Sequence, residues 1–162
     1  MFIRGIVTKL LRDSGTYGPP VNLNKIIKYL KKERGIEFHF NEEKLPAHLL
    51  GIAHKRFNTF NICYDTKEDV TVQRNTVAHE LGHLMLGHYY YTQDYTKDLN
   101  YNIRTTCEEE ADLFADELLI PHNWIVKDIK KEIASMESLA LKYQVDLYDM
   151  NHRIVSSDDI LF

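Results

Sequence analysis

The segment His79-Glu80-Leu81-Gly82-His83 carries the side chains with the clearest chemistry in the chain. Residues four positions apart leave the same face of an α-helix, so His79 and His83 can bind one ion. Glu80 lies on the flank of that face, where it can act on a water molecule instead of joining the histidines as a ligand. Neutral imidazole suits zinc, and a catalytic site leaves the fourth position open. The segment predicts a hydrolytic site for one Zn2+ ion with Glu80 as general base; the alternative is a set of ordinary surface or core side chains.

A third ligand must come from another element, and a predicted helix over 107–119 offers several carboxylates. Glu108 and Asp112 are four residues apart and share one face of that helix. We therefore predict Glu108 as the ligand and Asp112 as the acceptor of the outer N–H of a ligating histidine. Glu110 is the alternative ligand. An acidic first turn that the helix dipole stabilises is the alternative that needs no metal.

His88 is a further candidate for the third ligand. In the extended pattern His-Glu-x-x-His-x-x-Gly-x-x-His, glycine would stand at position 86 and histidine at 89, where this chain has Leu86 and Tyr89. The spacing therefore excludes that pattern. We interpret Gly87-His88 as a helix C-terminus with a cation near the negative end of the helix dipole.

The elements that position these residues come from a chain of 162 residues, which is long enough for one compact domain with its own core. The hydrophobic fraction of 44% and the charged fraction of 27% exclude a disordered or low-complexity chain. The net charge of -4 gives no positive field, so we expect no direct binding to nucleic acid or membrane. We find no signal peptide and no apolar run of membrane-spanning length, and we expect a cytoplasmic protein with reduced cysteines.

The hydrophobic periodicity predicts an α+β fold, with helices around a small antiparallel sheet. The expected helices cover 2–12, 23–34, 69–86, 107–119, 122–132, 135–143 and 147–156, the expected strands cover 36–40, 49–55 and 57–64, and 88–101 is expected to be a loop. We expect a metallopeptidase-like domain over 1–121. A helical tail over 122–162, which resembles a helix-turn-helix, is expected to pack on it.

The run 79–88, followed by 108–121, resembles the ImmA/IrrE family of gluzincin-like metallopeptidases. The lead-in from Pro20 to Asp65 is similar as well, so the resemblance covers about residues 20–121. It implies a zincin-like core in which His79, His83 and Glu108 hold zinc and Glu80 is the base. It also implies a bacterial, phage or mobile-element protease that cuts a helix-turn-helix repressor and so relieves transcriptional repression.

The remaining features concern the substrate. The strand 60–64 could offer an edge to an extended peptide, and the tyrosine-rich loop or His122 could supply a second donor to the oxyanion. Acidic residues outnumber basic ones from Lys131 onward, which opposes DNA binding and favours docking of a basic protein such as a repressor. The alternative function is a non-hydrolytic metal-binding regulatory module, or a DNA-binding module that uses the C-terminal helices. The sequence does not set the oligomeric state.

Overall fold

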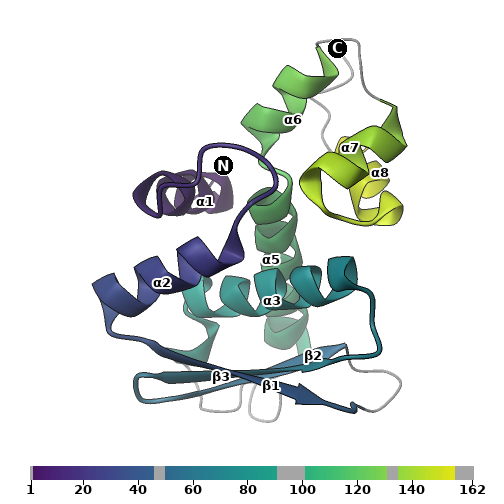
Figure 1. Ribbon diagram of the computed structural model, residues 1–162. Helices are drawn as coiled ribbons and strands as arrows, with labels where there is room; N and C mark the ends of the chain where they lie inside the picture. The colour runs from purple at the N-terminus through teal and green to yellow at the C-terminus, as the bar shows by residue number, and fades with distance from the viewer. Residues whose placement is uncertain (1, 46–49, 91–100, 131–134, 156–162) are drawn as a thin grey trace.

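The computed structural model describes residues 2–45, 50–90, 101–130 and 135–155. Two helices precede a small three-stranded sheet and the other helices follow it, and this segregation confirms the α+β class (Figure 1). The elements are α1 (Phe2–Asp13), α2 (Leu23–Arg34), β1 (Glu37–Glu43), β2 (Gly51–Arg56), β3 (Thr59–Asp65), α3 (Val70–Leu86), the 3-10 helix η1 (His88–Tyr90), α5 (Tyr101–Leu119), α6 (His122–Ile129), α7 (Met136–Tyr143) and α8 (Leu147–Val155).

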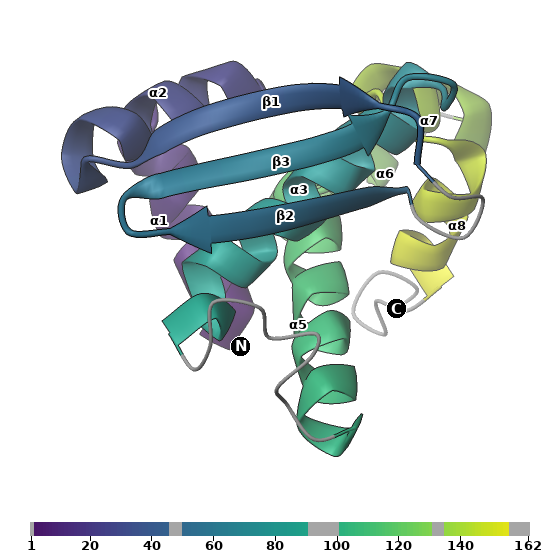
Figure 2. The same ribbon diagram turned by 90° about the horizontal axis from the view of Figure 1, so that it is seen from below.

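The sheet has the order β1-β3-β2, so β3 lies in the middle (Figure 2). β2 and β3 form the expected antiparallel hairpin, in which Arg56 pairs with Thr59. β1 runs parallel to β3, with Glu37 opposite Thr59, so the sheet is mixed instead of purely antiparallel. The physical reason is the strand order: the tight turn makes β3 antiparallel to β2, and β3 lies between β2 and β1 instead of at the edge of the sheet.

α3 is the central helix of the molecule. It lies on one face of the sheet, and α5 crosses it on its other side (Figure 1). Glu80, Gly82 and His83 are buried together with the apolar Leu81 and Leu84. A helix covered on several sides carries its polar site residues inside the fold.

α5 begins six residues earlier than predicted, at Tyr101 instead of Cys107. Its first turns are polar, so they show no apolar period, and the Thr106 hydroxyl donates to the carbonyl of Asn102 at 3.1 Å. Glu108 therefore lies in the middle of the helix. The interpretation of the acidic run as a first turn stabilised by the helix dipole is wrong.

The N-terminal helices form as predicted. The Asn22 side chain caps α2 by accepting from the backbone of Lys25 at 3.1 Å, and Gly35 ends the helix with φ 64°. The lysines of α2 are exposed. α1 packs on α5, and Arg4 lies 3.6 Å from Glu117.

The three C-terminal helices also form, although α6 ends at Ile129, three residues before the predicted end. α8 contacts the rest of the fold through Arg153, whose side chain donates to Glu117 and, at 3.1 Å, to the carbonyl of Ile120. Asn75 of α3 also donates to Asp149 at 2.7 Å. The division of the chain at residue 121 stays a prediction.

The hydrophobic core joins all of these parts. Its largest fully buried side chains come from every layer: Ile26, Leu30, Phe60, Ile62, Leu81, Phe114, Leu118, Leu119, Ile120, Ile125, Tyr143 and Met150. Cys107 is buried and Cys63 is half-buried. Within the described parts of the chain, no helix combines the length and apolar character that crossing a membrane requires.

Candidate active site

Three predicted ligands converge where α5 crosses α3. The Nε2 atoms of His79 and His83 lie 3.0 Å apart, and the Oε2 atom of Glu108 lies 3.2 Å from the first and 3.6 Å from the second. Among the described residues, these three form a group whose donor atoms all lie within 4.8 Å of one another. Two imidazole nitrogens and one carboxylate oxygen are the donor set that a catalytic zinc site uses, so the residues fit a zinc ion.

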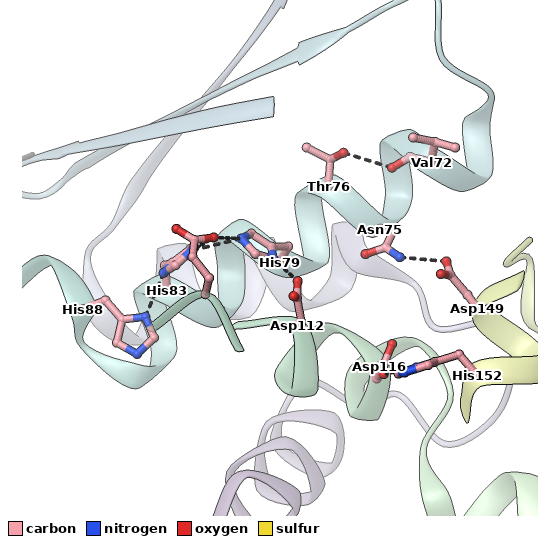
Figure 3. Close-up of polar contacts among 11 residues, drawn as sticks. Val72, Asn75, Thr76, His79, His83, His88, Asp112, Asp116, Asp149 and His152 are labelled. Carbon is pink, nitrogen blue, oxygen red and sulfur yellow. Dashed lines mark hydrogen bonds and ion pairs between the residues drawn. The ribbon is translucent and has the colours of Figure 1, made fainter. Parts of the chain in front are cut away.

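Asp112 holds the outer nitrogen of His79, as predicted. The Nδ1 atom of His79 lies 2.7 Å from Oδ1 of Asp112 (Figure 3). Burial alone would lower the pKa of His79, but hydrogen bonds to Asp112 and Glu108 outweigh it and raise this pKa to about 10 in the metal-free protein. Burial lowers the pKa of His83, so His83 stays neutral. In the metal-free site, His79 therefore carries a proton on a nitrogen that would bind the metal.

The interpretation of Gly87-His88 as a helix C-terminus holds for Gly87, but His88 turns back toward the candidate site. Gly87 does end α3, with φ 81°. His88 is only 3% exposed and points back at the site: its Nδ1 atom lies 2.7 Å from Nδ1 of His83 (Figure 3). Its Nε2 atom lies 3.1 Å from Oε2 of Glu110. Glu110, the alternative third ligand, thus contacts His88, whereas Glu108 contacts His79 and His83.

Glu80 is buried beside the histidines, and the hydroxyl of Tyr89 donates to its Oε2 atom at 3.2 Å. Burial raises the pKa of Glu80 to about 7, partly offset by the charge of His79 and the hydrogen bond from Tyr89. Tyr89 lies in η1, directly after the helix. The sequence singled out the tyrosine-rich loop only as a group, and no signal distinguished Tyr89 from its neighbours.

A cleft of about 670 Å³ opens onto these residues. His79, Glu80, Tyr89 and Glu108 line one part of it, and β2 lines another with Gly51, Ile52 and Ala53. A Cβ atom on Gly51 would overlap the side chain of Thr76, so β2 lies directly against α3.

The strand that offers an edge is β2, and the prediction for 60–64 is wrong. That segment belongs to β3, which pairs with β1 on one side and β2 on the other and has no open edge for a peptide. Among the described strands, β2 pairs only with β3.

Acidic side chains also line the cleft. Asp112 of α5 and Asp146 and Asp149 at the start of α8 line it together with Asn75. His122 does not take part: it lies at the start of α6, where its backbone N–H donates to Glu117 at 3.1 Å. Most of the tyrosine-rich loop, 91–100, lies outside the described residues.

A His-Glu-x-x-His helix crossed by a helix that brings a glutamate to both histidines defines a metallopeptidase-type domain. The model of peptidase family M78, described as the IrrE N-terminal-like domain, matches residues 32–155. The chain therefore belongs to the ImmA/IrrE family of zinc-type peptidases. The match includes every candidate site residue and extends through α8. No curated protein was found to match the chain.

A solved structure supports the fold. A Mycobacterium tuberculosis transcriptional regulator superposes with a TM-score of 0.69 at 14% sequence identity. The alignment covers 94% of this chain and 46% of the regulator, so the chain spans less than half of that protein. At this identity the likeness concerns the fold alone.

Proposed function

We propose that the chain is a zinc-dependent endopeptidase in which His79, His83 and Glu108 hold the ion and Glu80 is the general base. The observation that carries this proposal is the convergence of the three donor atoms, with distances of 3.0, 3.2 and 3.6 Å, beside a buried carboxylate in an open cleft. When bound, zinc supplies a Lewis acid that activates water and polarises the scissile carbonyl.

Glu80 takes the proton of the attacking water and passes it to the leaving amine. Its pKa of about 7 suits this task, because a base works best when its pKa lies near the working pH. Tyr89 fixes the carboxylate by donating to one oxygen, which leaves the other oxygen for the proton. The buried position of Glu80 keeps bulk water from competing for that proton.

The substrate binds along β2. An extended peptide can add through backbone hydrogen bonds to the edge of β2 that no described strand pairs with, beside Glu80 and His79. Asp146 and Asp149 then face part of the substrate in the cleft, and their charges select basic side chains. We propose a basic helix-turn-helix repressor as the substrate, whose cleavage relieves transcriptional repression in the cytoplasm. The same acidic surface opposes direct DNA binding by α7 and α8.

The experiment incubates the zinc-loaded protein with the repressor encoded beside it and, separately, with casein. Mass spectrometry then identifies the products. We expect one or a few cuts in the repressor and little cleavage of casein. Rapid digestion of casein beside an intact repressor contradicts the proposed specificity, and an intact repressor that binds DNA together with this chain supports the regulatory alternative.

A further inference from the structure

Three side chains from three elements form a chain of hydrogen bonds behind the candidate metal site. His83 of α3 contacts His88 of η1 through the two Nδ1 atoms at 2.7 Å. His88 contacts Glu110 of α5 through Nε2 and Oε2 at 3.1 Å. His83 is fully buried and His88 is 3% exposed, whereas the side chain of Glu110 is 47% exposed. This arrangement lets a charged carboxylate act on a buried imidazole while the charge itself stays near solvent.

The carboxylate of Glu110 determines which nitrogen atoms in this chain of hydrogen bonds carry protons. The ionised Glu110 only accepts hydrogen bonds, so Nε2 of His88 carries a proton. With its single proton on Nε2, the imidazole of His88 has an unprotonated Nδ1, and we infer that this atom accepts the hydrogen bond from His83. Nδ1 of His83 must therefore carry its proton, and its Nε2 atom keeps a free lone pair among the other candidate ligand atoms.

We propose that His88 and Glu110 are positioning residues that hold His83 in the Nδ1–H tautomer, the form whose Nε2 atom can bind a metal. A single contact with Asp112 holds the Nδ1 atom of His79, whereas the Nδ1 atom of the buried His83 is held through an intervening imidazole. The role toward zinc rests on the proposed function. The tautomer is a property of the metal-free protein and can be measured independently.

The first test is 15N NMR of the histidine side chains in the metal-free protein. We expect His83 to show a protonated Nδ1 and an unprotonated Nε2 in the wild type. In Glu110→Gln the neutral amide can accept or donate, so the two nitrogen shifts of His83 move toward each other. The control is Glu109→Gln, which removes the same charge from the adjacent exposed position and leaves both shifts unchanged. A proton on Nε2 of His83 in the wild type overturns the proposal.

The second test is zinc affinity, measured by competition with a chelator. We expect Glu110→Gln and His88→Leu to weaken zinc binding by about ten- to hundredfold, as loss of an outer partner of a ligating histidine does. His88→Gln restores most of the affinity, because its amide oxygen accepts from His83 and its NH2 group donates to Glu110.

The outcomes separate this proposal from the proposed function. Equal zinc affinity in Glu110→Gln and Glu109→Gln, or equal loss in His88→Gln and His88→Leu, overturns the positioning role. Wild-type protein that binds no zinc but shows the predicted tautomer overturns the proposed function and leaves the hydrogen-bond chain intact.

Discussion

Gly82 lies against the backbone of Ala111 at the point where α3 and α5 cross. A Cβ atom at position 82 would lie 3.0 Å from the carbonyl oxygen of Ala111 and 3.1 Å from its Cα atom. These distances are closer than side-chain atoms normally approach a backbone. The glycine between the two histidines thus sets the helix separation that brings Glu108 to the site.

Gly82→Ala should push the helices apart, because the backbone of α5 cannot yield as a flexible side chain can. We expect a loss of about 1–3 kcal/mol of unfolding free energy, as for other overpacked sites, together with weaker zinc binding. Urea unfolding of the metal-free protein measures the first effect. The control is Gly5→Ala in α1, where a Cβ atom has no neighbour within 4 Å and alanine should be neutral or stabilising. Equal effects of the two substitutions contradict this account of the crossing.

Arg153→Met should destabilise the protein strongly. The side chains of Arg153 and Glu117 are 9% and 8% exposed, so the substitution leaves a buried carboxylate without its main partner. Removing one member of such a pair costs about 3–5 kcal/mol. Lys28→Met on the exposed face of α2 is the control and should change stability little. Thermal and urea unfolding check both, and a loss no larger than that of the control shows that α8 is not held by this pair.

Zinc binding should release about one proton near pH 7. The pKa of His79 is about 10 in the metal-free protein, so zinc must displace its proton before binding Nε2. Protonation competes with the metal, so affinity falls about tenfold for each pH unit of acidification over the range 6–8. Calorimetry in two buffers of different ionisation enthalpy counts the protons. A count of zero contradicts the protonation that we assign to His79.

The double variant Asp146→Asn/Asp149→Asn should lose affinity for basic substrates. Each removed charge weakens a partly exposed ion pair by about 0.5–1 kcal/mol, so KM rises about two- to fivefold for each while kcat changes little. Asparagine at position 146 can still accept from the backbone of residue 149, which preserves the start of α8. Glu33→Gln on α2 serves as the control for the loss of one charge outside the cleft, and its KM should stay that of the wild type. An unchanged KM for a lysine-rich peptide excludes a role of these acids in selectivity.

Helix periodicity explains how much of the site could be predicted from the sequence. The spacings of His79 and His83, and of Glu108 and Asp112, are local, so each pair could be placed on one helix face without knowing the fold. The contact of His88 with Glu110 joins positions 22 residues apart and depends on how the chain turns after Gly87. Residue spacing alone cannot predict a contact between side chains on either side of such a turn.

The fold shows the same division between local and distant features. The cap of α2 at Asn22 and its end at Gly35 follow from residue types alone. The parallel pairing of β1 with β3 does not, because the pattern of a strand fixes its faces but leaves its neighbours open. That pairing puts β3 in the middle of the sheet and leaves β2 as the edge strand that lines the cleft, which is where we propose that a substrate adds.

The central claim is that Glu80 acts as a base and is not a ligand. It is tested most directly by measuring bound zinc and repressor cleavage together in Glu80→Gln, with the wild type and His83→Ala for comparison. We predict one zinc ion per chain in the wild type and in Glu80→Gln, a loss of zinc in His83→Ala, and cleavage by Glu80→Gln reduced by about 100-fold or more. A Glu80→Gln protein that lacks zinc, or that keeps zinc and cleaves at the wild-type rate, contradicts the claim.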